Sequence, residues 1–333
     1  MKAKVFLQCV NDNQKFCRMG GISDFFVIVM GKLERYLLVK RLFRLFATME
    51  EIYIGTSTKR RRSISGKENS VKTRYWNGKR KMDIEKRQTT KVLNRDVIKY
   101  LAIIAMLLNH IATILLNSNT LILRIVFLDI GYFTAITMCY FLVEGYDYTH
   151  SKFKNAMRLL VFALISQIPY SMAFAKEKYI DFACLNMLFS LFLCFIICLI
   201  FDKVPKILPK ILCMVPILVC SFQCDWGIGA PVFTLLFLWA KKSDKKKKIA
   251  FLLPALLFGI FNFVGRLGKV SIVMSLFCAV GCMIGMGLSG ICIIYFYNGK
   301  RWEKGKTFSK WFFYIFYPAH LFILALIRIY VIV

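Results

Sequence analysis

The chain of 333 residues is 58% hydrophobic and 15% aromatic, and it carries 47 Lys and Arg against 18 Asp and Glu, a formal net charge of +29. Soluble domains are usually about 45–50% apolar, and disordered chains are far less apolar, so the composition excludes both classes. It indicates a multi-pass membrane protein whose positive charge lies in the connections and at the N-terminus.

Residues 1–92 form a basic N-terminal extension that differs from the rest of the chain. Residues 1–81 hold 19 Lys and Arg and 6 Asp and Glu. The apolar stretch at 33–49 is interrupted by basic residues, as in a helix that lies in the membrane surface. In an alternative interpretation the protein starts near Met82, and what precedes it has no fold of its own. The extension lacks the pattern of any nucleic-acid-binding module, so no nucleic-acid partner is expected.

Residues 93–333 form the predicted membrane domain. About 20 helical residues cross a hydrocarbon core, and the chain divides here into apolar segments of about that length. The predicted fold class is all-α, a polytopic bundle of about nine transmembrane helices, with eight to ten as the range. The fifth and sixth segments are short, so a re-entrant pair is the alternative for them. The predicted spans are 97–117, 121–143, 158–175, 183–201, 207–223, 226–240, 249–265, 270–297 and 309–332.

Lysine and arginine are concentrated in alternate connections between these spans. Basic connections stay on the cytoplasmic side of a membrane, so the alternation predicts a cytoplasmic N-terminus. Only Arg266 and Lys269 are basic residues in a connection predicted to be on the outer side. The connections at 144–158, 202–210, 241–248 and 299–306 are basic, and those at 118–120, 176–182 and 224–225 are neutral or acidic.

The eighth span contains several glycines, among them Gly281 and Gly285. Two small residues four positions apart lie on one helix face and let a second helix approach closely. This spacing therefore favours a helix-packing role over a chemical one.

Four polar residues lie at similar depth within the predicted spans: His110, Asp129, Gln167 and His320. Ionisable groups are costly in lipid, which makes each a functional candidate. Histidine takes and returns protons near neutral pH when a second group fixes its tautomer. Asp129 is one candidate for that second group, and a pair with Arg124 is an equally good use of its carboxylate. Equal depth does not show whether these helices are neighbours.

Two further carboxylates lie near the ends of spans. Glu144 is expected where the second span meets the cytoplasm, and Asp225 lies at the outer surface. No metal site is expected, because the three histidines are far apart and no cysteine lies at ligand spacing from any of them. The cysteines are mostly in apolar runs and are expected to be small buried hydrophobic residues.

Seven short motifs follow one another across about 235 residues, and together they resemble the TraX family, which is named for the membrane protein required for F-pilin acetylation. That family is distantly similar to type 3 membrane acyltransferases. The motifs are Lys99–Met106 with Asn109-His110-Ile111, Phe141–Gly145, Arg158–Tyr170, Leu185–Leu191, Asp225-Trp226-Gly227, Tyr297–Arg301 and Phe313–Leu321.

The resemblance implies an acyltransferase site on these motifs. In it His110 would take the proton of the acceptor nucleophile, and His320 or Gln167 would stabilise the oxyanion. The donor would be acetyl-CoA or another acyl-CoA, its phosphates held by the basic inner connections, with no metal required. The family usually has an acidic residue where this chain has Asn109, whose amide is then expected to orient the His110 ring. The full set is His110, His320, Gln167 and Glu144 as catalytic residues, and Asn109, Asn186, Asp225, Asn298 and Tyr317 as substrate-binding residues.

The expected partners are the lipid bilayer of a bacterial inner membrane and a membrane-associated acceptor, such as a pilin-like protein, a glycan or a lipid. Two other functions are compatible with the same residues. A proton-coupled transporter would use the buried histidine and aspartate but needs a continuous polar pathway, and few polar residues are available to line one. A membrane assembly protein without chemistry would depend on helix packing instead.

Overall fold

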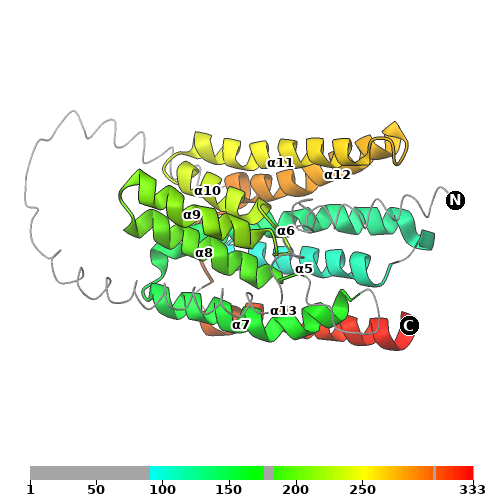
Figure 1. Ribbon diagram of the computed structural model, residues 1–333, viewed down its shortest axis with the longest axis horizontal. Helices are drawn as coiled ribbons and strands as arrows, with labels where there is room; N and C mark the ends of the chain where they lie inside the picture. Colours follow the sequence, from blue (N-terminus) through cyan, green and yellow to red (C-terminus); the bar gives the residue numbers. More distant parts are fainter. Residues whose placement is uncertain (1–90, 117, 176–183, 303–304, 333) are drawn as a thin grey trace, which may run out of the picture. The chain divides into compact units, whose positions relative to one another are not determined.

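The computed structural model describes residues 91–116, 118–175, 184–302 and 305–332. The basic extension, apart from its last two residues, and the expected start near Met82 lie outside them. Nine α-helices occur in the described residues, and they match the nine predicted spans one for one (Figure 1). They are α5 (Arg95–Ile114), α6 (Leu121–Tyr148), α7 (Lys152–Ala173), α8 (Met187–Lys203), α9 (Ile207–Ser221), α10 (Gly229–Ala240), α11 (Asp244–Arg266), α12 (Ile272–Ile291) and α13 (Lys306–Ile327).

Six of these helices are long and apolar enough to cross a membrane: α5, α6, α7, α11, α12 with its C-terminal extension, and α13. The other three are shorter, with 17 residues in α8, 15 in α9 and 12 in α10. The all-helical, multi-pass class is therefore confirmed. The crossing of the membrane by the three shorter helices stays a prediction.

Polar residues mark where the helices begin. Asn94 accepts a hydrogen bond from the Val97 amide at 2.9 Å, and Asn186 accepts one from the Leu188 amide at 3.0 Å. Ser151, Ser243 and Ser271 cap α7, α11 and α12 in the same way. Such caps satisfy amide groups that have no partner within the helix, so these five helices each begin at a defined residue.

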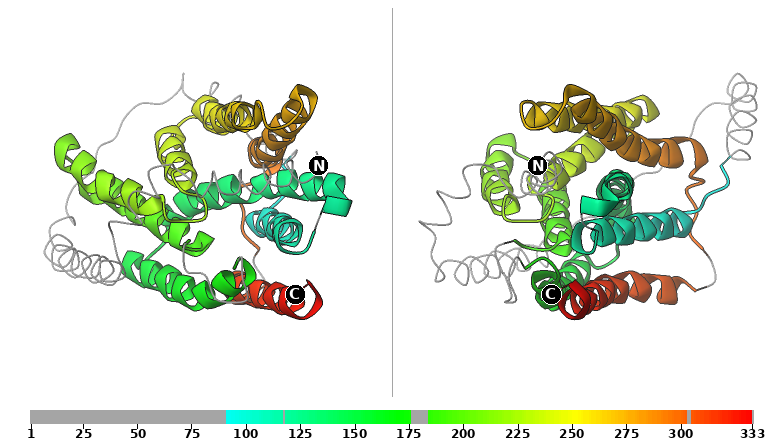
Figure 2. Two further views of the ribbon diagram at one scale, coloured as in Figure 1. Left: turned by 45° about the vertical axis from the view of Figure 1, so that its right-hand side comes forward. Right: turned by 90° about the vertical axis from the view of Figure 1, so that its right-hand side faces the viewer.

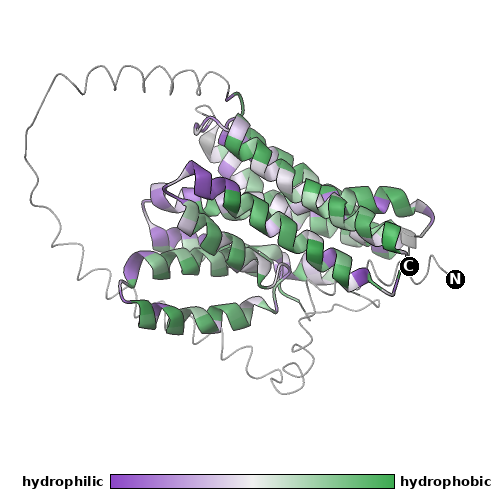
Figure 3. Ribbon diagram, turned by 90° about the horizontal axis from the view of Figure 1, so that it is seen from above, coloured by the Kyte–Doolittle hydropathy of each residue, from purple (hydrophilic) through white to green (hydrophobic). Residues whose placement is uncertain are grey.

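The basic connections all lie at one end of the bundle, which we call the basic end. Lys241 pairs there with Asp147 at 2.5 Å, and the Tyr146 hydroxyl donates to Asp202 at 3.1 Å. In Figure 3 the hydrophilic residues are densest at this end, although some also lie at the other. At the opposite end the backbone of Leu185 pairs with the segment around Cys224. The described connections thus separate by charge as the sequence predicted.

Helix α6 is central among the described helices. It packs against α5, α8, α10 and α12, while α13 packs against α5 and α7. In Figure 2, α6 lies between the α11–α12 pair and the α7–α13 pair. This arrangement places the faces of α5, α7 and α13 toward one another.

The packing role predicted for the glycines of α12 is confirmed. A Cβ atom on Gly281 would collide with the carboxylate of Asp129, and one on Gly285 would collide with the Asp129 backbone oxygen. The two glycines therefore let α6 and α12 approach closely. The Asp129 side chain faces α12.

Candidate functional site

A pair of buried histidines joins the first and last helices of the described chain. His110 on α5 is 6% exposed and His320 on α13 is 4% exposed. His110 Nδ1 lies 2.8 Å from His320 Nε2, and the two ring planes differ by 4°. Two residues that are 210 positions apart in sequence thus form one hydrogen-bonded unit.

The backbone fixes which nitrogen of each ring carries a proton. His320 Nδ1 lies 2.8 Å from the Phe316 carbonyl oxygen, which can only accept, so this nitrogen donates. In neutral His320 the other nitrogen, Nε2, is then an acceptor, and His110 Nδ1 donates to it. His110 Nε2 consequently keeps an unshared electron pair. The arrangement makes His110 the base of the pair and His320 the group that orients it.

Aromatic rings surround the two histidines. Phe174 meets the His110 ring edge to face at 5.6 Å between centroids, and Phe316 stacks on the His320 ring at 4.9 Å. The Tyr317 ring lies 6.5 Å from that of His110 and 5.6 Å from that of His320. These contacts restrict both imidazoles to one orientation and keep apolar surface around them.

A cavity of about 500 Å³ leads from the basic end toward this pair. Exposed residues of the α6–α7 connection line its outer part, and Met106, Met187, Leu188 and Tyr317 line its inner part. Met106 lies one helical turn before His110 on α5. Neither histidine lines the cavity, but Tyr317, which does line it, packs against both imidazole rings.

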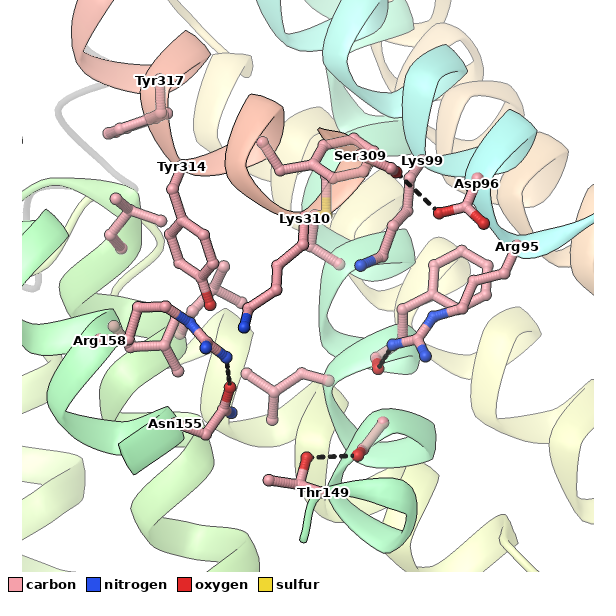
Figure 4. Close-up of a pocket in the computed structure, with 18 of the residues that line it drawn as sticks. Arg95, Asp96, Lys99, Thr149, Asn155, Arg158, Ser309, Lys310, Tyr314 and Tyr317 are labelled. Carbon is pink, nitrogen blue, oxygen red and sulfur yellow. Dashed lines mark hydrogen bonds between the residues drawn. The ribbon is translucent and has the colours of Figure 1, made fainter. Parts of the chain in front are cut away.

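Most charged residues in the cavity wall are cations. Figure 4 shows Lys99, Arg158 and Lys310 converging on the same space from three helices. Asp96, the carboxylate in the wall, accepts hydrogen bonds from the Trp302 amide at 2.8 Å and the Ser309 hydroxyl at 2.9 Å. The basic residues in the wall are Arg95, Lys99, Lys154, Arg158, Arg301 and Lys310.

Arg95 is the most deeply buried of these cations, at 8% exposed. Its Nη2 donates to the Phe141 carbonyl at 3.0 Å, and the absence of a side chain on Gly145 leaves room for the guanidinium. Its Nε is buried without a hydrogen-bond partner. The ion pairs formed among the described residues include none of the wall cations. Glu144 and Asp96 lie near enough to attract the Arg95 guanidinium but form no ion pair with it, and the wall holds more cations than carboxylates, so it is suited to an anion.

Of the other predicted site residues, Tyr317 lies against the histidine pair, whereas Gln167 and Asn186 are engaged with each other. Gln167 accepts from the amide and the side chain of Asn186, at 3.1 and 3.0 Å, and donates to the Cys184 carbonyl at 2.8 Å. Asn186 also donates to the Ala163 carbonyl at 2.7 Å while it caps α8. Both amide side chains are thus used to hold α7 against α8.

Asn109 is directed toward α6 instead of toward the His110 ring. Its amide nitrogen lies 3.4 Å from the Leu128 carbonyl, and its side chain fills the space beside Gly131. The predicted hydrogen bond that would orient His110 is replaced by the bond that His110 Nδ1 donates to His320. Successive residues of a helix point about 100° apart, which explains why the two neighbours face different helices.

Glu144 and Asn298 lie together at the basic end. The Tyr297 hydroxyl donates to Glu144 at 2.9 Å. Burial, followed by the nearby Glu144 carboxylate, raises the pKa of Tyr297, so its hydroxyl stays protonated and continues to donate. Asn298 accepts from the Lys300 amide at 2.8 Å, and its own amide donates to the Leu93 carbonyl. This cluster joins the start of α5 to the segment after α12.

Asp225 lies at the opposite end. It accepts a hydrogen bond from the Tyr170 hydroxyl at 3.1 Å, and its amide donates to the Leu185 carbonyl at 2.8 Å. The Tyr170 ring in turn stacks near Phe174, 4.7 Å away. Aromatic side chains therefore connect Asp225 with the surroundings of His110.

No individual role was predicted for the cations of the cavity wall. The basic connections were expected as a group to set the orientation in the membrane and to hold the phosphates of an acyl-CoA. A more specific signal was present in the spacing. Arg95 and Lys99 are four residues apart, as are Lys154 and Arg158, so each pair lies on one helix face.

Comparisons with known proteins agree on one family. The family model described as TraX protein matches residues 94–328. A protein of Dichelobacter nodosus named "Probable fimbrial assembly protein FimC, serogroup H1" is 33% identical over 238 residues, which cover 68% of this chain and 92% of the relative. No solved structure matches the chain.

Proposed function

The chain belongs to the TraX family, and from that premise we propose that it is an integral membrane acyltransferase. It moves an acetyl or similar group from an acyl-CoA to an amine or hydroxyl of a membrane-associated acceptor. The observation that carries the proposal is the hydrogen-bonded pair of His110 and His320 near the inner end of a cation-lined cavity.

His110 acts as the general base. The acceptor N–H or O–H gives its proton to His110 Nε2 while the acceptor atom bonds to the thioester carbonyl carbon. The imidazolium that forms is stabilised because His110 Nδ1–H donates to His320, whose own Nδ1–H donates to Phe316. When the C–S bond breaks, His110 returns the proton to the leaving thiolate. The proton and the bonding electron pairs are all accounted for, so the step needs no further reactant.

The cavity wall holds the donor. A cavity of about 500 Å³ is within the usual range of about 300–1,000 Å³ for small-molecule sites. Arg95, Lys99 and Arg158 offer charge-assisted hydrogen bonds to phosphate oxygens near the basic end. The thioester then extends past Met106 and Leu188 to the histidine pair. This direction of binding also agrees with a cytosolic source of the donor.

Tyr317 contacts the reacting carbonyl in this proposal. Its hydroxyl oxygen accepts a hydrogen bond from the Met187 amide at 3.1 Å, at the first residue of α8. The hydroxyl hydrogen can then be donated toward the oxygen on which negative charge develops. Both nitrogens of His320 are already used, so the oxyanion role expected for His320 passes to Tyr317.

The remaining predicted residues support the site from a distance. Gln167 and Asn186 position the start of α8, which carries the Met187 amide. Glu144 and Asn298 shape the basic end near Arg95, and Asp225 lies at the end from which an acceptor would approach. A pilin-like acceptor is favoured by the name of the Dichelobacter relative, which describes fimbrial assembly.

The test is acyl transfer in reconstituted vesicles. The purified full chain is incubated with [¹⁴C]acetyl-CoA and membranes of the source organism, and label is followed in protein, glycan and lipid fractions. We expect label in one fraction, lost with His110→Gln and retained with Asn262→Ala. Asn262 is a matched control because it is a buried polar residue on α11, bonded to the Phe258 carbonyl and remote from the cavity.

Each alternative function predicts a different result. If wild-type protein labels nothing and His110→Gln retains biological function, the acyltransferase proposal is wrong and an assembly role is favoured. If His110→Gln instead abolishes the proton-dependent movement of a solute across the vesicle membrane, transport is favoured.

A further inference from the structure

Six lysines lie within eight residues where α10 ends and α11 begins. We call Lys241, Lys242, Lys245, Lys246, Lys247 and Lys248 the lysine corner. It lies at the basic end, but none of its residues lines the cavity. Its role is therefore a separate question from donor binding.

Only part of this charge is compensated within the described chain. Lys241 pairs with Asp147 at 2.5 Å and Lys247 pairs with Asp244 at 3.2 Å. Lys246 and Lys248 instead lie over aromatic rings, with Nζ 4.8 Å from the Trp239 centroid and 5.3 Å from the Tyr295 centroid. A lysine held over a ring keeps its full charge and its capacity to donate to an anion.

The aromatic partners of these lysines are themselves exposed. Trp239 is 49% exposed and Tyr295 is 54% exposed. Tryptophan and tyrosine are enriched where a membrane meets water, because their rings have an apolar body and a polar edge. The two rings therefore mark the depth of the lipid headgroups on this side of the bundle.

Exposed apolar side chains continue from the lysines along the same face of α11. Ile249 follows Lys245 by four residues and is 48% exposed, and Leu252 follows Lys248 by four residues and is 60% exposed. Residues four apart on a helix lie one above the other. A molecule bound here would meet cations at one end and apolar surface at the other.

The end of α12 completes this surface. The chain widens from the α-helix into a π-helical turn at Cys292–Phe296, which includes Tyr295. Helix α11 packs along α12 and also contacts this turn. The turn thus brings Tyr295 beside Lys248, a residue of a different helix.

We propose that the lysine corner binds the headgroup of an anionic phospholipid from the leaflet at the basic end. Lys245, Lys246 and Lys248 contact the phosphate, and the acyl chains lie along Ile249 and Leu252. A lipid fits better than a dissolved phosphate, because the apolar half of the surface offers nothing to a small hydrophilic anion. Clusters of basic residues next to membrane helices bind anionic lipids in this manner.

The experiment measures phosphatidylglycerol binding to the full chain in detergent by native mass spectrometry. The test variant carries Lys245→Gln, Lys246→Gln and Lys248→Gln together. Loss of three contacts is expected to weaken binding on the order of 100-fold, since each lysine near an anionic surface contributes about 1 kcal/mol. A thermal melt of each variant confirms that it is folded, which these exposed or half-buried side chains should permit.

The matched control carries three substitutions in another connection at the same end. Lys203→Gln, Lys206→Gln and Lys210→Gln remove the same charge, and Lys210 also lies over an aromatic ring, that of Phe201 at 4.7 Å. Binding within about twofold of wild type is expected for this control. Equal weakening by both triple variants would overturn the proposal, because the effect would then be diffuse charge alone. Displacement of the lipid by equimolar glycerol 3-phosphate would also overturn it.

Discussion

The protonation pattern of His110 and His320 depends on one acceptor atom of the backbone. The Phe316 carbonyl fixes the proton of His320, that proton fixes the acceptor role of its other nitrogen, and His110 Nε2 is left basic. A lone buried histidine would have two tautomers of similar energy. The pair has one, which suits the same proton being taken and returned in each cycle.

Substitution of either histidine by glutamine should lower kcat. His110→Gln removes the base and is expected to cost about 10²–10⁴ in kcat, the usual contribution of general base catalysis. His320→Gln should cost less, because His110 remains. The double variant should be no slower than His110→Gln, since residues that act as one unit are not additive. Additive losses measured in the acetyl transfer assay would contradict the pairing.

Tyr317→Phe keeps the ring against both histidines and removes only the hydroxyl. We expect kcat to fall about 10²–10³-fold, as for other oxyanion donors, with KM for the acyl-CoA nearly unchanged. The control is Tyr314→Phe, whose ring packs on Phe162 and which lies farther along the cavity from the pair. A larger effect of Tyr314→Phe than of Tyr317→Phe would argue against the assignment.

Arg95→Gln tests the cavity at the donor side. A hydrogen bond from a charged group contributes about 1.5–3 kcal/mol, so KM for the acyl-CoA should rise by about 10–150-fold while kcat changes little. Lys242→Gln, at the same end but outside the cavity, should leave KM unaltered. Steady-state kinetics at varied donor concentration gives both constants. If only kcat changed, the assignment of Arg95 to donor binding would be wrong.

Among the elements, α6 and α12 form a contact that depends on two small residues. Asp129 occupies the space that a side chain on Gly281 would need, and the backbone of α6 lies against Gly285. The half-buried Asp129 carboxylate therefore has a packing role, and the Arg266 charge lies near it.

Gly281→Ala should therefore destabilise the protein. Overpacking of a close contact costs about 1–3 kcal/mol, and we expect a lower unfolding temperature in detergent. Gly287→Ala is the matched control on the same helix, because nothing lies within 4 Å of the Cβ it would introduce. That variant should unfold at or slightly above the wild-type temperature, since alanine favours helix. Equal unfolding temperatures for the two variants would contradict the close approach of α6 and α12.

At the scale of the whole molecule, charge separates the two ends of the helices. The connections at the basic end contain the cavity opening and the lysine corner, and the opposite end contains Asp225 and the Leu185–Cys224 pairing. In the proposed reaction, a cytoplasmic basic end would have the donor and the acceptor approach from different sides of one membrane. The histidine pair then lies where the two paths meet.

Reporter fusions test this orientation. A cytoplasmically active fluorescent protein inserted after Lys242 should be bright, and alkaline phosphatase inserted after Gln223 should be active, because basic connections are retained in the cytoplasm. Exchange of the two reporters provides the control, and both exchanged fusions should be inactive. The opposite pattern would reverse the direction proposed for donor binding.

Hydropathy, segment length and charge are properties of the chain read in order, so the amino-acid sequence was enough to predict the membrane class, the helical segments and the family. It also predicted a similar depth for His110, Asp129, Gln167 and His320. That His110 meets His320, that Asp129 faces Gly281 and that Gln167 holds Asn186 follows only from the folded arrangement of the helices. Depth along a helix follows from residue number, whereas the neighbour of each helix and the face it presents follow from packing among all nine. The convergence of Lys99, Arg158 and Lys310 on one cavity depends on the same packing, since each comes from a different helix.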